Sequence, residues 1–585
     1  MIQKKRIASV GIIILIGFCL LTFHLSMIQL FRTTAYSSEH VNLIKKSIEQ
    51  RTSAYVLNDG RGELVDRHGE SLTTEKKRAL ILFPFLKGQN WPITKVSQLL
   101  GVDPDQIKQA LSKNNKPFAF LPTRMPISDQ AEQEINAMNI TGAKIVEVTL
   151  PKTGASSSYI LGIANQNPAL VKKRYNDLLT EGVINPATPV GSLGLQEAFD
   201  PFLLSRNETR LLYHTTGEGK PLFKESVRYA SGASESFYPL KVKTTLDASI
   251  QQLAQKTIQA EGIKKGGVVL LDAKTNSLLA MVSAPGLDPK HPFSHPNYML
   301  TPEFPGSVFK VVTAAASIES NIVNDSMTFD CNKDVYGEGE ASRQLGTLGF
   351  QQSFSESCNY TFATLGNRLM ESNLKALDQT AEKLGLTQEE GWHGNVFHYK
   401  DFEQIPDEGT TTLFSKESDR HNQKAIAQTS IGQLNVKTTP LSIANMMSTI
   451  ARGGEKWSVR TATEIDYNKM GNMQLVTFPH QVLSGPTLEP YTVMRLQDLL
   501  RSVVTDPQGT GHFLSDASYT VAGKSGTAET GRGTENSWFA GYFPADDPKY
   551  VMVAVDLDVK PGASHTLSLY KDMVNGLYAY DQQHP

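Results

Sequence analysis

The sequence predicts an α+β or α/β fold that follows a single N-terminal membrane helix. An uncharged, largely apolar run covers residues 7–31. Strand-like segments occur at 267–283 and again at 518–556, with helical segments between them. Because the two strand groups are far apart in the chain, we expect one sheet that joins sequence-distant strands. The 585 residues are enough for roughly two to four domains.

The N-terminal run has the length and flanking charges of a membrane anchor. A helix of this length spans about 37 Å, more than the ~30 Å hydrocarbon core of a bilayer. Lys4, Lys5 and Arg6 precede the run, which by the positive-inside rule places the N-terminus in the cytoplasm. A cleaved signal peptide is the alternative, but Ser26 to Leu30 contain no convincing small-x-small cleavage site. We therefore expect a cytoplasmic tail at 1–6, a transmembrane helix at 7–31, and an extracytoplasmic remainder of a single-pass plasma-membrane protein.

Residues 32–240 contain helix, strand and turn patterns without a catalytic motif. We expect a helical extension of the anchor at 32–50, and helices ending near Leu111 and covering 129–138. Arg61 to Gly69 has an apolar centre and a turn ending, as a strand and turn would, and its charges favour a surface ion-pair network. Residues 205–240 are polar and predict a linker. The whole of 32–240 is interpreted as a mixed α+β pedestal domain.

Residues 241–585 are predicted to form the second extracytoplasmic domain. β-branched and apolar enrichment indicates strands, and the 3.6-residue period indicates helices. The predicted elements are a helix at 248–261, a hairpin of 267–272 and 277–283, strands at 518–527, 537–543 and 550–556, and a closing helix at 566–580. They predict a central sheet with a helical block.

Composition excludes several function classes. Hydrophobic and charged contents of 40% and 20% are those of ordinary folded protein, and the net charge of −2 gives no basic field for nucleic acid. The three cysteines, Cys19, Cys331 and Cys358, contain no CxxC pair, which excludes a zinc ribbon or a thioredoxin motif. Cys331 and Cys358 are compatible with a disulfide in an oxidising compartment, but sequence does not give their separation.

The first motif with chemistry is Ser307-Val308-Phe309-Lys310, directly after Pro305-Gly306. The turn and the alanine-rich segment that follows place Ser307 at a helix start and Lys310 one turn later on the same face. A serine is a weak nucleophile until a base removes its proton, and a buried lysine with a lowered pKa is such a base. An N-cap serine followed by a solvent lysine gives the same local pattern.

Two further motifs follow in order. Ser357-Cys358-Asn359 offers a hydroxyl for proton relay and a carboxamide for positioning. Lys524-Ser525-Gly526-Thr527 lies in a predicted strand, where a lysine attracts a carboxylate and a glycine admits substrate backbone. A polar turn and an exposed strand lysine explain each motif alone. The ordered set in an exported protein is far more specific.

The set S-x-x-K, S-x-N and K-[ST]-G resembles the penicillin-recognising serine enzymes, and the chain is similar to class B, monofunctional penicillin-binding proteins over nearly its whole length. Arg61 to Gly69 resembles that family's strand-and-turn motif. Gly191 to Asp200 resembles its "GxxGLExxYD" motif, with Gln196 for Glu and Phe199 for Tyr. Further matches are Thr245–Asp247, 268–283, Ser430–Gln433 and Gly509–Gly511.

The resemblance implies a role for each motif residue. Ser307 is the nucleophile and Lys310 its proton acceptor, while Ser357 and Asn359 move a proton and position substrate. Lys524, Ser525 and Gly526 bind the terminal carboxylate and backbone. The backbone N–H groups of Ser307 and Thr527 form the oxyanion hole. No metal or organic cofactor is implied.

The implied reaction is D,D-transpeptidation of peptidoglycan stem peptides that end in D-Ala-D-Ala, with β-lactams as covalent mimics. A separate glycosyltransferase and proteins of division, elongation or sporulation are the implied partners. Two alternatives stay open: a D,D-carboxypeptidase or other hydrolase on the same fold, and a non-catalytic wall-binding scaffold or sensor.

Overall fold

The computed structural model forms two compact units. It describes residues 2–31, 33, 43–123, 125–152, 158–205, 208–216, 220–222, 228–231, 239–467 and 473–584. The first unit comprises 1–60, 75–150 and 207–234, and the second comprises 61–74, 151–206 and 235–585. Segments of the expected pedestal thus belong to the same unit as residues 241–585. The domain boundary at residue 240 stays a prediction.

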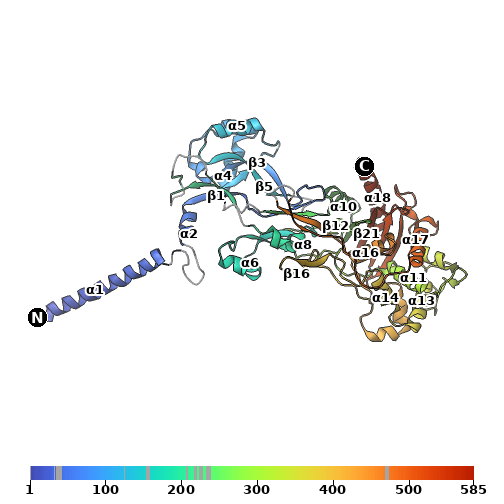
Figure 1. The fold of residues 1–585 in the computed structure, drawn as a ribbon. Coiled ribbons are helices and arrows are strands. Elements are labelled where there is room, and N and C mark those ends of the chain that lie inside the picture. Colours follow the sequence, from blue (N-terminus) through green and yellow to red (C-terminus); the bar gives the residue numbers. More distant parts are fainter. Residues whose placement is uncertain are drawn as a thin grey trace. The chain divides into compact units, whose positions relative to one another are not determined.

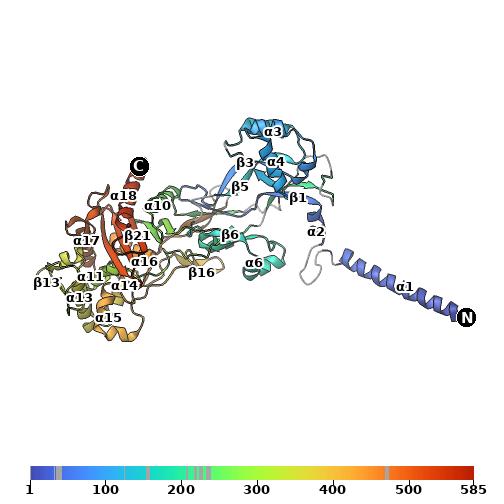
Figure 2. The same ribbon diagram turned by 180° about the vertical axis from the view of Figure 1, so that it is seen from behind.

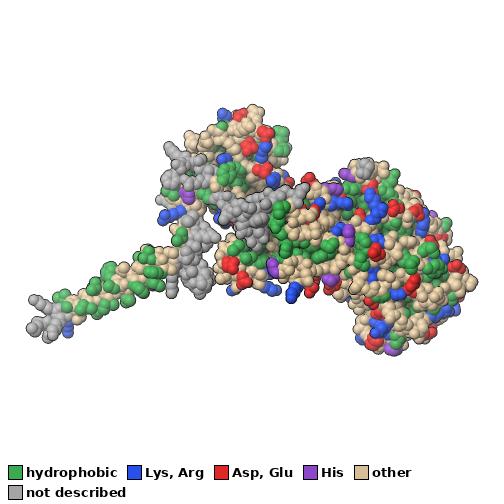
Figure 3. Space-filling model, in the orientation of Figure 1, with side chains coloured by type: hydrophobic (Ala, Val, Ile, Leu, Met, Phe, Trp, Pro, Cys, Tyr) green, Lys and Arg blue, Asp and Glu red, His purple; other side chains and the backbone are tan. Residues whose placement is uncertain are grey.

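The N-terminal segment is one long apolar helix. α1 (Ile2–Ser26) continues as a π-helical turn at Met27–Phe31. Residues Arg6–Phe31 have a mean hydropathy of 2.4 in their most apolar window, and none of that window is buried. Hydrophobic side chains are spread along the visible length of this helix (Figure 3). Among the residues that the structure describes, it is the one helix long and apolar enough to cross a bilayer.

The first unit is built on two small sheets. One has the strand order β1-β8-β9 and the other β4-β3-β5. The strands are β1 (Thr52–Asn58), β3 (Thr74–Leu82), β4 (Phe118–Phe120), β5 (Ala143–Pro151), β8 (Thr209–His214) and β9 (Arg228–Ser231). The helices are α2 (Leu43–Gln50), α3 (Ile93–Leu100), α4 (Pro104–Lys113) and α5 (Asp129–Ala137).

The expected linker at 205–240 is wrong in part, because it contains β8 and β9. Leu211 and Tyr213 alternate into a small core, and the rings of Tyr213 and Phe83 meet edge to face at 4.7 Å. Two inward side chains in a polar stretch are enough to hold a short strand once a neighbouring strand supplies the core. Residues 206–207, 217–219, 223–227 and 232–238 of this stretch lie outside the described residues.

The second unit contains the predicted central sheet, which is antiparallel with the order β12-β11-β21-β20-β19. Its strands are β11 (Gly266–Asp272), β12 (Leu278–Ala284), β19 (Ala522–Glu529), β20 (Glu535–Phe543) and β21 (Tyr550–Val559). β11 pairs with β21 along its whole length, so the sheet joins sequence-distant strands as expected. The mixed α+β prediction is confirmed, with β21 lying among helices in both views (Figures 1 and 2), and the strand pairing places β19 at one edge of the sheet.

Helices cover both faces of this sheet. β11 alternates its side chains between two cores: Val268 and Leu270 pack toward α10 (Ala248–Ala260) and α18 (Thr566–Gln583). Val269 and Leu271 belong to the larger core on the other face, which includes α16 (Pro440–Ala451) and the helical block. The block also contains α11 (Lys310–Glu319), α12 (Phe350–Ser355), α13 (Asn359–Ser372), α14 (Ala376–Lys383), α15 (Gln423–Ser430) and α17 (Pro490–Thr505).

The remaining elements of this unit form small sheets and short helices. A sheet of order β18-β17-β10-β2 comprises β2 (Glu63–Val65), β10 (Leu240–Thr244), β17 (Ala462–Tyr467) and β18 (Gln474–Thr477). Strand pairs are β6 (Ile163–Gln166) with β7 (Pro189–Leu193), β13 (Thr328–Asp330) with β14 (Thr347–Gly349), and β15 (His393–Val396) with β16 (Tyr399–Glu403). Short helices are α6 (Pro168–Arg174), α7 (Asn176–Thr180), α8 (Gly194–Ala198) and α9 (Asp200–Leu203).

The two motif segments of residues 61–69 and 191–200 meet in this unit. Arg61 forms an ion pair of 2.8 Å with Asp200, and both side chains are buried. Arg61 also donates to Gln196 Oε1 at 2.7 Å, and Asp200 accepts from the Gly191 N–H. The expected surface ion-pair network is therefore wrong for Arg61. An arginine is expected at the surface from sequence alone. A guanidinium that donates to several acceptors is nevertheless stable when buried.

Candidate active site

Ser307 lies in a tight turn that feeds directly into a buried helix. The 3₁₀ turn Gly306–Phe309 precedes α11, and every residue from Lys310 to Ile318 is buried. Gly306 has a φ of +54°, a backbone conformation that favours glycine. Its N–H donates to Gly432 O at 3.1 Å. The turn is thus held by a hydrogen bond to the segment that contains Gly432. Ser307 itself is half-buried.

The edge strand β19 lies against this turn with no room for side chains between them. A Cβ on Gly306 would lie 2.3 Å from Thr527 O, and a Cβ on Gly526 would lie 2.4 Å from Pro305 O. These contacts bring the backbone of the third motif directly beside Ser307. A glycine is therefore required at position 526, because any side chain there would collide with the Ser307 turn.

Lys310 is the centre of the hydrogen-bond network. Its side chain is completely buried. The Nζ donates to Asn359 Oδ1 at 2.7 Å, to Ser357 O at 2.8 Å and to Ser357 Oγ at 3.1 Å. The first and second motifs are thus in direct contact.

The second motif is held in an uncommon backbone conformation. Ser357 lies between α12 and α13 with a φ of +62°, which is costly for a residue with a side chain and is concentrated at functional sites. This conformation presents both the carbonyl and the hydroxyl of Ser357 to Lys310. Asn359 follows as the first residue of α13.

Lys524 contacts the same hydroxyl of Ser357. Its Nζ donates to Ser357 Oγ at 3.1 Å and to Ser525 O at 3.1 Å. Ser525 Oγ donates to Thr510 Oγ1 at 2.7 Å. Along β19, Lys524 and Gly526 are buried, whereas Ser525 is half-buried and Thr527 is exposed. All three motifs therefore converge on Ser357 and the edge of the sheet.

Burial and neighbouring positive charges depress the pKa of both lysines. Desolvation lowers the pKa of Lys310 well below its usual 10.5, and the charges of Lys524 and Arg343 lower it further. Desolvation followed by the charge of Arg343 lowers the pKa of Lys524 to about 7. A neutral amine near Ser307 is what a proton acceptor requires.

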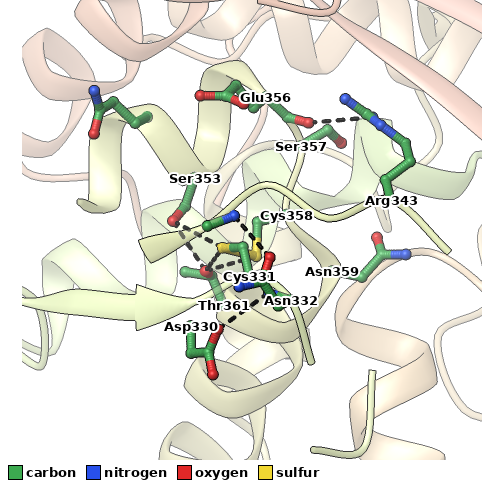
Figure 4. Close-up of a disulfide and its surroundings, with 12 residues drawn as sticks. Asp330, Cys331, Asn332, Arg343, Ser353, Glu356, Ser357, Cys358, Asn359 and Thr361 are labelled. Carbon is green, nitrogen blue, oxygen red and sulfur yellow. Dashed lines mark hydrogen bonds between the residues drawn. A yellow bond between two sulfur atoms is a disulfide. The ribbon is translucent and has the colours of Figure 1, made fainter. Parts of the chain in front are cut away.

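A disulfide joins Cys331 to Cys358, the middle residue of the second motif (Figure 4). The cystine lies beside the hydroxyls of Ser353 and Thr361, with Thr361 Oγ1 donating to Ser353 Oγ at 3.0 Å. The question that sequence left open is thereby answered in favour of pairing. The disulfide ties the Ser357 turn to the segment that leads from β13 to β14.

Arg343 and Thr510 are the neighbours that motif reasoning did not assign to the site. Arg343 comes from the β13–β14 connection and donates to Glu356 O at 3.4 Å. Thr510 belongs to a segment matched only as a family feature, and its hydroxyl donates to Ser355 O at 3.3 Å. No local pattern marks Arg343, since its relevance depends on a loop folding back over the second motif.

Comparison with known proteins gives a consistent picture. The family model described as "Penicillin binding protein transpeptidase domain" matches residues 266–573. The chain is 27% identical to "Stage V sporulation protein D" of Bacillus subtilis, over 85% of this chain and 74% of the relative. It is 21% identical to "Peptidoglycan D,D-transpeptidase MrdA" of Haemophilus influenzae, over 100% of this chain and 92% of the relative.

The fold also matches a solved structure. A chain from "Structural coordination of polymerization and crosslinking by a peptidoglycan synthase complex" is similar with a TM-score of 0.63 and 23% identity. The match covers 97% of each chain. At this identity, the likeness establishes the shared fold.

Proposed function

The chain belongs to the penicillin-binding protein transpeptidase family, in its class B branch, and on that basis we propose that it cross-links peptidoglycan stem peptides through an acyl-enzyme on Ser307. The observation that carries the proposal is the convergence of the three motifs. Lys310 contacts Ser357 and Asn359, Lys524 contacts Ser357, and β19 lies against the Ser307 turn. This arrangement supports nucleophilic acyl transfer with lysine as the proton acceptor.

Substrate binds along β19 in this proposal. An edge strand has unpaired N–H and C=O groups, which an extended peptide can meet as an additional strand. Lys524 and Ser525 receive the terminal carboxylate of D-Ala-D-Ala, and the strand backbone at Gly526 meets the backbone of the peptide. The N–H groups of Ser307 and Thr527 face the scissile carbonyl oxygen and stabilise the oxyanion.

Acylation begins when neutral Lys310 takes the proton of Ser307 Oγ. The oxygen attacks the penultimate D-Ala carbonyl and gives a tetrahedral oxyanion. The C–N bond then breaks, and the proton passes from Lys310 through Ser357 Oγ to the departing amine, which leaves as free D-Ala. The product is an ester on Ser307. Asn359 holds Lys310 in place throughout.

Deacylation reverses these roles. An amine of a neighbouring stem peptide attacks the ester carbonyl and loses a proton to the lysine–serine relay. The C–O bond breaks, Ser307 regains its proton, and the new peptide bond forms the cross-link. β-Lactams enter the same path, but the opened ring stays attached to the acyl group and blocks the acceptor.

The surroundings that we propose follow from the same family membership. The helix Arg6–Phe31 anchors the chain in the plasma membrane with the catalytic unit outside, where a disulfide is stable. A separate glycosyltransferase supplies the glycan strands, as part of a division, elongation or sporulation assembly.

Product analysis tests the reaction. The full chain in detergent is incubated with a D-Ala-D-Ala pentapeptide with and without a primary-amine acceptor. We expect D-Ala release together with acceptor-linked tetrapeptide, both absent in Ser307→Ala. Release of D-Ala with free tetrapeptide alone would make the enzyme a carboxypeptidase. No release from a folded protein that binds the peptide would favour a scaffold.

A further inference from the structure

Arg343 is held over the second motif by an organised loop. The β13–β14 connection is fixed by Asn332, whose side chain accepts from the Gly346 N–H at 2.8 Å and whose carbonyl accepts from the Ala341 N–H at 2.7 Å. The disulfide between Cys331 and Cys358 attaches this connection to the second motif. Arg343 reaches from it toward the turn of Glu356 and Ser357 (Figure 4).

Three cationic side chains gather at the site, and the carboxylate of Glu356 is near enough for its charge to interact with that of Arg343. The charges of Lys524 and Arg343 act on Lys310, and the charge of Arg343 acts on Lys524. Among the residues that the structure describes, no ion pair joins any of the three to a carboxylate. Two of them are already bound to groups of the motifs. Arg343 is the exposed one, and its only hydrogen-bond acceptor in the described structure is the Glu356 carbonyl at 3.4 Å.

A guanidinium in this situation can meet an incoming anion. It has five N–H donors in a planar fork that matches a carboxylate. A long bond to one carbonyl leaves most of these donors to solvent. Arg343 lies beside the second motif, where it donates to Glu356 O, whereas in the proposed function the terminal carboxylate meets the Ser525–Thr527 segment of β19.

We propose that Arg343 is a specificity-determining residue that binds a second carboxylate of the acyl donor, on the part of the peptide upstream of the bond that Ser307 attacks. This inference rests on the proposed function and adds a ligand group to it. The terminal carboxylate meets Lys524 and Ser525 at the strand, and the upstream carboxylate meets Arg343 at the second motif. The donor is thus held by charge at both ends of the reacting segment.

Two β-lactams test this directly. Carbenicillin differs from benzylpenicillin by one carboxylate on the acyl side chain, the side that corresponds to the upstream peptide. The second-order rate of Ser307 acylation is measured for both compounds on the full chain in detergent. We expect Arg343→Gln to lower the ratio of the carbenicillin rate to the benzylpenicillin rate about fivefold to tenfold, the worth of one charge-assisted contact at an exposed site.

Further variants keep the outcome interpretable. Arg343→Lys keeps the charge and should retain part of the ratio, whereas Arg343→Glu should lower it below that of Arg343→Gln. Arg495 lies on α17 and forms an ion pair with Asp325. As a control, Arg495→Gln should leave the ratio unchanged. A ratio that is the same in wild type and Arg343→Gln overturns the proposal, as does an equal fall of both rates, which indicates only a role in holding the turn. Failure of both β-lactams to acylate wild type contradicts the proposed function instead.

Discussion

Lys310 and Lys524 share one hydrogen-bond partner, because the Nζ of each lies 3.1 Å from Ser357 Oγ. Both side chains are completely buried. Two ammonium groups that share one hydroxyl as hydrogen-bond partner repel each other in a medium that screens poorly. The pair is therefore most stable when it carries fewer than two charges, which leaves a neutral amine available for Ser307. The apparent pKa values in kinetics belong to this pair as a unit.

The acylation rate should rise with pH. In the proposed mechanism the active form of Lys310 is the neutral amine, and its pKa is lowered by desolvation and by the charges of Lys524 and Arg343. As pH rises through that lowered pKa, the neutral fraction and the rate increase, with a plateau reached well below pH 10.5. Labelling rates with a fluorescent penicillin from mildly acidic to alkaline pH measure this. Lys310→Ala should acylate at least about 100-fold more slowly, and a flat wild-type profile would count against the base.

Removing a buried cation should stabilise the protein while inactivating it. Lys524 has a folded pKa of about 7 against 10.5 for an unperturbed lysine. Between these values the unfolded chain binds more protons, so the wild-type free energy of unfolding rises with pH across that window. Lys524→Met removes the cost of burying the charge but also removes two hydrogen bonds. We expect the free energy of unfolding to increase by about 1–3 kcal/mol at neutral pH.

Thermal unfolding of wild type and Lys524→Met at several pH values checks this. The advantage of the variant should shrink as pH approaches 10.5, because the wild-type lysine then loses its charge in the unfolded chain as well. Lys76→Met, at an exposed lysine, is the matched control. A variant less stable than wild type at neutral pH would contradict the claim that burying Lys524 costs the folded protein free energy.

Gly526→Ala should disable acylation. The added methyl would lie 2.4 Å from Pro305 O and 2.8 Å from Val308 Cγ2, so β19 must move away from the Ser307 turn. A displacement of about 1 Å between reacting groups costs about 100-fold in rate. Penicillin labelling measures the loss. Gly286→Ala, with open space around the new methyl, should label like wild type, and an equally active Gly526→Ala would refute the close approach.

Loss of the disulfide should lower stability. Cys331 and Cys358 are separated by 27 residues, and closing a loop of that size is worth about 3–4 kcal/mol through the entropy of the unfolded chain. The Cys331→Ala/Cys358→Ala double variant should unfold at a lower denaturant concentration than wild type under non-reducing conditions. Cys19→Ala, at an exposed cysteine of α1, should not change the midpoint. Equal midpoints would mean that the bridge does not constrain the chain.

Local pattern predicted most of the central sheet because its strands are buried on both faces. Val268 to Leu271 form a continuous apolar run between two turn signals, and β11 spans that run. The edge strand β19 was less well predicted at its start. Ser518 is occupied by hydrogen bonds to Asn575 Oδ1, so the strand begins at Ala522, after that contact.

The candidate site could be predicted as a set of residues but not as a network. Motif spacing indicates Ser307 and Lys310 on one helical face. The contact of Lys524 with Ser357 spans 167 residues of sequence and depends on how the sheet meets the helical block. Arg343 and the disulfide depend on the same tertiary arrangement. The sequence therefore predicts which residues belong to the site, whereas the contact between the two lysines and Ser357 is known only from the fold.

The most direct test of the central claim is the intact mass of the full chain after incubation with benzylpenicillin, with Ser307→Ala as the control. We predict a stable one-to-one adduct on wild type, located at Ser307 by peptide mapping, and none on the variant. An adduct at another residue, or the same adduct on Ser307→Ala, would contradict Ser307 as the nucleophile.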